Sequence, residues 1–208
     1  MKQTLRHLKL VSFAVALFVA AGVAATAASA ASTGSCSWPS IFQAFASWSD
    51  SSWYFLAPGG DFRDTSGWSL SGGAGVTSGG AGYNATDTNS LALPTTSSAA
   101  TTPAICVTSQ APVLRMFIKN NGNLGHTDGQ LAIYLNFTGA DGKPQQVKIA
   151  GLTVKSTGWT LTPPISFIQY ISTPLQSGFA NISFTIKPND NHGNWQIDQL
   201  YVDPYLSR

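Results

Sequence analysis

Large apolar residues recur at every second position along three stretches of this chain: 113–119, 130–138 and 181–187. The alternation is clearest in the second stretch, where every other residue is large and apolar: Leu131, Ile133, Leu135 and Phe137. Successive side chains of a β-strand point to opposite faces of the sheet. A period of two therefore predicts strands that bury one face and leave the other in solvent.

Shorter stretches bounded by Gly, Pro, Asn and Asp are expected to form further strands: 53–57, 68–71, 91–93, 105–107, 146–150, 165–170 and 195–202. In the last of these, strict alternation places Tyr201 on the same face as Trp195, and Leu200 on the opposite face. About ten short strands separated by turns predict an all-β antiparallel sandwich of two sheets.

The connections between these strands are also marked by residue type. Asp141-Gly142 lies between two expected strands and favours a hairpin turn. The glycine-rich stretch 71–82 and the small, polar stretch 95–102 are expected to be loops at an edge of the sandwich.

Low charge narrows the possible classes of protein. Charged residues make up 10% of the chain and glutamate is absent, whereas charged residues are about 25% of a typical soluble domain. This composition excludes a helical bundle, a coiled coil and a charge-rich disordered chain.

The net charge after the N-terminal segment is slightly negative. Three of the 11 basic residues lie within residues 1–9, so 11 − 3 = 8 basic residues and 9 Asp remain, a net charge of −1. Because no Lys/Arg cluster remains, a nucleic-acid partner is not expected.

The N-terminal segment has the pattern of a secretory signal peptide. Basic residues within 1–9 precede an apolar run over about 10–23, and Ala28-Ser29-Ala30 follows as a cleavage site. We predict that residues 1–30 are removed, that residues 31–208 form a single domain, and that this domain is secreted and not held at a membrane. An uncleaved membrane anchor is the alternative.

Two cysteines, Cys36 and Cys106, remain after this segment. In an oxidising compartment we expect them to form a disulfide that closes a loop of 106 − 36 = 70 residues. A catalytic thiol or half of a zinc site is the alternative, but His126 and His192 lack a metal-binding spacing.

Aromatic residues supply the candidate ligand-binding side chains. Sugar rings stack on aromatic faces, and amides or carboxylates bond to the sugar hydroxyls. Trp159 follows a predicted turn, and together with Tyr83 and Tyr170 it is our candidate binding residue. The alternative is that these rings belong to the core.

Signals of catalysis are poor. The chain has no Gly-x-Ser-x-Gly elbow and no glutamate, and no spacing singles out a pair of aspartates for glycoside hydrolysis. Gly80-x-Gly82-x-x-Ala85 approaches a dinucleotide fingerprint, but the residues after it do not favour a helix. We therefore predict no catalytic residues and no enzymatic activity. A secreted hydrolase is the alternative, and it would need two carboxylates converging in one cleft.

Both ends of the domain carry motifs of a known fold. Ala57-Pro-Gly-Gly-Asp-Phe62, Gly67-Trp-Ser-Leu70 and Gly72-Gly-Ala74 resemble the opening of galactose-binding-like, carbohydrate-binding-module-like jelly rolls, and residues 193–205 (GNWQIDQLYVDPY) resemble their last strand. The whole chain is also similar to short secreted actinobacterial proteins of unknown function. The resemblance implies a jelly-roll sandwich and specifies a fold better than an activity.

The same resemblance implies a structural calcium ion between the first turn and the last strand. Asp61 and Asp198 match the aspartates of that family, whereas Arg63 and Gln199 stand where further acidic residues are common. The alternative is an ion pair of Arg63 with Asp61 or Asp198. No other cofactor is expected.

These observations together favour a secreted, non-catalytic module that binds a glycan or a cell-envelope polysaccharide by aromatic stacking. A structural or protein-interaction protein of the cell surface, without a sugar site, is the alternative. The sequence does not specify the ligand or the oligomeric state.

Overall fold

The computed structural model of the chain describes residues 36–84, 86–108, 112–122, 129–154, 156–171, 178–189 and 194–204. The predicted signal segment, His126 and His192 lie outside these residues. The described residues belong to one compact unit, Thr33–Arg208, and none of its helices is long and apolar enough to span a membrane within the described ranges.

The fold is a two-sheet antiparallel sandwich, as predicted, in which the described strands form sheets of seven and six. The first sheet has the order β10 (Thr160–Leu161), β7 (Val113–Asn120), β13 (Trp195–Asp203), β4 (Asn89–Leu93) and β3 (Gly75–Ser78). Two short strands pair with it: β1 (Phe55–Leu56) with β13, and β11 (Ile165–Ser166) with β7.

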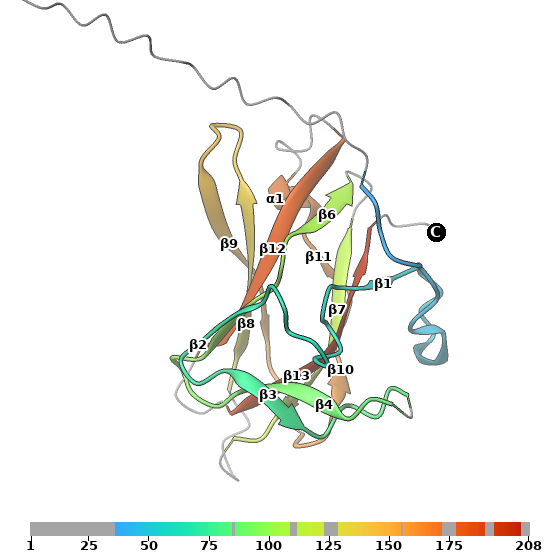
Figure 1. The fold of residues 1–208 in the computed structure, drawn as a ribbon, viewed down its shortest axis with the longest axis vertical. Helices are drawn as coiled ribbons and strands as arrows, with labels where there is room; N and C mark the ends of the chain where they lie inside the picture. Colours follow the sequence, from blue (N-terminus) through green and yellow to red (C-terminus); the bar gives the residue numbers. More distant parts are fainter. Residues whose placement is uncertain are drawn as a thin grey trace, which may run out of the picture. The chain divides into compact units, whose positions relative to one another are not determined.

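The second sheet has the order β2 (Ser69–Ser71), β5 (Ala99–Thr101), β12 (Phe179–Pro188), β8 (Leu131–Thr138) and β9 (Pro144–Leu152), with β6 (Ile105–Thr108) paired to β12. Its long strands β8 and β9 form a hairpin beside β12 (Figure 1). The described helical segments are the short η1 (Ala46–Trp48) and α1 (Ile168–Ile171).

The core lies between the sheets and is built by the alternation seen in the sequence. Leu131, Ile133 and Leu135 of β8 are fully buried, and they meet the apolar faces of β7 and β12 in one cluster. Burying each such side chain contributes about 1.5–3 kcal/mol. The three alternating stretches are therefore confirmed as strands that each turn one face to the core. The expectation of a solvated second face is wrong for β7, whose outer residues are buried as well.

The last strand departs from strict alternation. Gln199 has a φ of 51°, and the pairing of β13 with β7 shifts between Asp198 and Tyr201. Such a bulge inserts one extra residue and reverses which face later side chains occupy. Leu200 consequently joins Trp195 in the core, while Tyr201 packs on the other face of the sheet. The expected grouping of Tyr201 with Trp195 is wrong for this reason.

Both stretches expected to be loops contain strands. The glycine-rich stretch holds β3, which pairs with β4, and the small, polar stretch holds β5, which pairs with β2 and β12. Small residues (glycine, serine and alanine) are common in both stretches and have little strand propensity, so pairing with neighbouring strands is needed to extend the chain around Val76, Thr77 and Thr101. The expected strand at 165–170 is also too long, since it ends after β11 and α1 follows.

The predicted hairpin turn and disulfide are both present. Gly142 has a φ of 74°, and the Gly139 N–H donates to the Lys143 carbonyl across the β8–β9 turn at 2.8 Å. Cys36 and Cys106 are bonded, with 5.5 Å between their Cα atoms. The Trp38 Nε1–H also donates to the Cys106 carbonyl at 2.7 Å, so two contacts hold residues 36–38 against β6.

Candidate functional site

The outer face of the first sheet is covered by the segment that precedes β1. Phe45 and Tyr54 from this segment are almost completely buried and pack with Phe117 and Tyr201, which project outward from β7 and β13. Phe45 is in edge-on contact with Tyr54 and Tyr201, with ring centroids 5.0 and 5.3 Å apart. Aromatic side chains from this protein therefore already occupy much of this face.

An ion pair fixes the covering segment to the sheet. The Arg115 guanidinium binds the Asp50 carboxylate and also donates to the Thr162 carbonyl at 2.8 and 3.0 Å. Burial opposes ionisation of Asp50, but hydrogen bonds from Tyr54, Ser52 and Arg115 outweigh it and lower the pKa of this carboxyl. The charges of both partners are satisfied within the protein.

Two of the predicted ligand-binding residues border this covered face. The Tyr83 hydroxyl donates to the Ala44 carbonyl at 2.6 Å, and its ring stacks on Trp48. Trp159 is half-buried, with the Lys119 Nζ 5.8 Å from the centre of its ring. The third candidate, Tyr170, packs instead against the central core. The structure therefore does not bring the three candidates together, and their role in binding stays a prediction.

The outer face of the second sheet is open and polar. We call it the open face and define it by residues that alternate with core residues on β8, β9 and β12: Tyr134, Asn136, Gln146, Lys148, Ser183, Thr185 and Lys187. All of these side chains are partly or fully exposed. Among the described residues, no other chain segment forms a core cluster on this side of the sheet.

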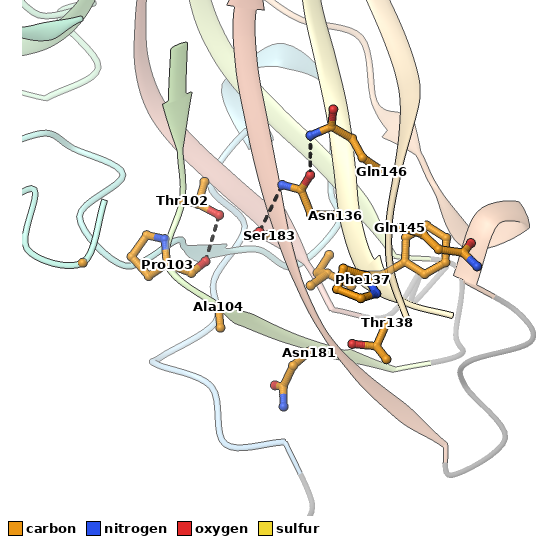
Figure 2. Close-up of a pocket in the computed structure, with 13 residues that line it drawn as sticks. Thr102, Pro103, Ala104, Asn136, Phe137, Thr138, Gln145, Gln146, Asn181 and Ser183 are labelled. Atoms are coloured by element: carbon orange, nitrogen blue, oxygen red, sulfur yellow. Dashed lines mark hydrogen bonds between the residues drawn. The ribbon is translucent and has the colours of Figure 1, made fainter. Parts of the chain in front are cut away.

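A row of hydrogen bonds runs across three strands of the open face (Figure 2). The Asn136 Nδ2 group donates to the Ser183 Oγ at 3.1 Å and to the Thr185 Oγ1 at 2.9 Å. The Gln146 Nε2 group donates to the Asn136 Oδ1 at 2.6 Å. These contacts orient two amides and two hydroxyls toward solvent, each with capacity to bond further.

A hollow of about 560 Å³ adjoins this row. It lies where two neighbouring strands separate: β8 pairs with β12 only as far as Asn136–Ser183. Beyond that point β8 continues to Thr138 beside β9, and β12 continues beside β6. Thr138 and Asn181 line the opening between them (Figure 2). The volume falls within the range of about 300–1,000 Å³ that is typical of small-molecule sites.

The first turn and the last strand lie side by side, as the jelly-roll resemblance implies. The Leu200 N–H donates to the Gly60 carbonyl at 3.0 Å. The Arg63 Nε lies 3.5 Å from the Asp61 Oδ2, so of the two ion pairs given as the alternative to calcium, the one with Asp61 is present. No group of three or more His, Cys, Asp or Glu side chains within the described ranges is arranged to hold a metal ion. Calcium at Asp61 and Asp198 stays a prediction without further support.

Asp198 is fully buried and tightly bonded. Its Oδ2 accepts the Ala81 N–H and its Oδ1 accepts the Gln199 N–H, both at 2.7 Å. Burial, with a smaller contribution from the nearby Asp87, raises the pKa of Asp198 to about 8, although the hydrogen bonds from the Ala81 and Gln199 N–H groups lower it. At this position the protonated carboxyl is favoured near neutral pH.

No protein-family model matches the sequence, and no curated protein matches it. Solved structures do match. A xylan-binding domain of carbohydrate-binding module family 22 superposes with a TM-score of 0.51 at 15% identity, over 76% of this chain and 99% of that one. The fold is that of these modules. The predicted resemblance to carbohydrate-binding-module sandwiches is thereby confirmed at the level of fold.

Two further matches are multi-module proteins. The N-terminal tandem family 22 modules from Paenibacillus barcinonensis give a TM-score of 0.52 at 11% identity, over 84% of this chain and 47% of that one. The family 22 and catalytic modules of Clostridium thermocellum endo-1,4-β-D-xylanase 10B, complexed with xylohexaose, give 0.51 at 14% identity, over 70% of this chain and 27% of that one. This chain therefore corresponds to about a quarter of that matched chain. The expected similarity to short secreted actinobacterial proteins stays a prediction.

Proposed function

We propose that this protein is a secreted, non-catalytic module that binds a glycan on the open face of its second sheet. The observation that carries the proposal is the row of bonded amides and hydroxyls, Gln146–Asn136–Ser183, beside the hollow. The other sheet offers no comparable row among the described residues, because the protein's own aromatic residues cover much of its outer face.

The chemistry of the open face suits a sugar. A glycan presents many hydroxyl groups that both donate and accept, and amides and hydroxyls of the protein do the same. Because hydrogen bonds within the row hold these side chains in place, binding costs less side-chain entropy. Tyr134 lies two residues before Asn136 on β8, on the same face, and adds an aromatic ring at the edge of the row.

Other features support the same proposal. The fold is shared with family 22 modules, whose matched members include a xylan-binding domain and a complex with xylohexaose. The disulfide suits an oxidising compartment, in agreement with the predicted signal peptide. No described strand of the second sheet contains an aspartate, and the chain has no glutamate, so the open face lacks the carboxylate pair of a glycosidase.

The test is binding of the purified, oxidised protein to a glycan array and to insoluble polysaccharides. Asn136→Ala removes the central amide and is expected to weaken binding about tenfold. Trp53→Ala is the matched control, since Trp53 is exposed but lies outside the open face. A second arm uses Trp159→Ala. Loss of binding in that variant, with Asn136→Ala unchanged, would move the site to the first sheet.

A protein-interaction role is the second candidate. Phe42, Trp48 and Trp53, all in the segment before β1, expose 42%, 46% and 42% of their surface, and exposed aromatic residues are enriched at protein interfaces. Light scattering tests whether the protein self-associates. Self-association that Trp48→Ser abolishes, together with no binding to any glycan, would favour this candidate.

A further inference from the structure

Both arginines that the structure describes are used inside the protein. Arg115 binds Asp50, and Arg63 lies 3.5 Å from Asp61. Neither belongs to the second sheet. Because each arginine has an aspartate partner, the positive charges without an acidic partner among the described residues are those of lysines.

Two of those lysines lie on the open face. The Lys187 Nζ is 4.6 Å from the centre of the Tyr134 ring, and the Lys148 Nζ donates to the Gln130 Oε1 at 2.6 Å. Neither has a carboxylate within ion-pair distance among the residues that the structure describes. Their contacts are with a ring and an amide, which orient an ammonium group without neutralising it.

Strand register places the two lysines on either side of Tyr134. Lys148 is directly opposite Tyr134 on β9, and Thr185 is opposite Tyr134 on β12. Lys187 follows Thr185 by two residues and therefore lies on the same face. Tyr134 is thus flanked by positive charge from both neighbouring strands, next to the row centred on Asn136.

The open face is positively charged although the chain after residue 30 is slightly negative as a whole. Excluding residues 1–30, the chain carries 8 basic and 9 acidic residues. None of the aspartates belongs to β2, β5, β8, β9 or β12. The aspartate nearest in sequence to the β8–β9 pair within the described residues is Asp141, in the turn, where its Oδ1 accepts the Lys143 N–H at 3.1 Å.

We propose that the glycan bound on the open face is an acidic polysaccharide, with sugar carboxylates placed against Lys148 and Lys187 and sugar hydroxyls on the row of Asn136. This inference rests on the proposed function and names its ligand class. A nucleic acid is a poorer occupant, because its binding relies on Lys and Arg side chains that neutralise many phosphates, and the open face supplies two ammonium groups.

The experiment compares polygalacturonate with the same polymer after its carboxyl groups are reduced. Binding of the full, oxidised protein is measured by affinity electrophoresis or calorimetry. The acidic polymer is expected to bind more tightly and to lose affinity as salt rises from about 0.05 to 0.5 M, because exposed charges are screened. Lys148→Gln and Lys187→Gln are each expected to weaken this binding by about 2- to 5-fold.

Lys119→Gln is the matched control, because Lys119 also lies over an aromatic ring, that of Trp159, but belongs to the first sheet. Its binding is expected to equal that of the unmodified protein. Equal affinity for the acidic and reduced polymers, or for xylan, would overturn the acidic ligand and leave the glycan-binding function standing. Absence of binding to every glycan tested would overturn both. Equal affinity for a DNA strand of similar length would also overturn the inference.

Discussion

Asp198 gives the protein a stability that depends on pH in an unusual direction. Its side chain is fully buried, and its pKa is raised from 3.8 to about 8 in the folded protein. Between these two values the folded state binds one proton more than the unfolded state. Stability from this group is therefore complete below pH 4 and is lost as the pH rises through about 8.

The size of the effect follows from the two pKa values. Each pH unit within this window changes the free energy of unfolding by about 1.4 kcal/mol. From pH 5 to pH 7.5 the expected loss is thus about 3 kcal/mol. Asp50 acts in the opposite direction, because its lowered pKa makes its contribution disappear only when the pH falls below about 4. The window above pH 5 therefore separates the two groups.

The assay is urea denaturation followed by tryptophan fluorescence at half-unit steps from pH 5 to pH 8, for the unmodified protein and Asp198→Asn. The asparagine cannot accept both the Ala81 and the Gln199 N–H groups, so the variant is expected to be less stable than the unmodified protein by about 1–3 kcal/mol at pH 5. Because asparagine does not titrate, the variant should not show the fall in stability caused by Asp198, and the difference between the two proteins should shrink as the pH rises. A difference that stays constant across this window would refute the raised pKa of Asp198.

Two further predictions concern stability. Replacing Cys36 and Cys106 together by serine opens a 70-residue loop and should lower the free energy of unfolding by about 4 kcal/mol. Added reductant should lower the stability of the unmodified protein but not that of the variant. An unchanged urea midpoint in the variant would contradict the loop-entropy argument. Gly72→Ala should destabilise by about 1–3 kcal/mol, because φ there is 60° and a Cβ would lie 1.9 Å from the Ser97 carbonyl oxygen. Gly75→Ala is its control, with no atom within 4 Å, and equal losses in the two variants would show that the close approach is not the cause.

The sequence predicts the sandwich because the core is made by the strongest local signal, alternation over about seven or eight residues. It does not predict the bulge at Gln199, which depends on how β13 fits between β4 and β7. It also does not predict β3 and β5, because small residues (glycine, serine and alanine) are common in the stretches around Val76, Thr77 and Thr101, and the strands form through pairing with neighbours.

The candidate site was harder to predict than the fold. Aromatic rings and a predicted turn indicate Trp159, Tyr83 and Tyr170, and the structure places the first two at the covered face and Tyr170 against the core. The proposed open face uses polar residues of the alternating strands instead, since Asn136 and Ser183 lie on the solvent face of their strands. They are 47 positions apart in the sequence, yet in contact. Only the register between β8 and β12 brings them together, and a single sequence does not contain that register.

The most direct test of glycan binding on the open face is chemical-shift mapping of the backbone amides during titration with oligogalacturonate. The account predicts that the largest shifts fall on β8, β9 and β12 around Asn136 and Tyr134. Shifts confined to the residues around Tyr83 and Trp159, or no shifts with this ligand and with xylo-oligosaccharides, would contradict it.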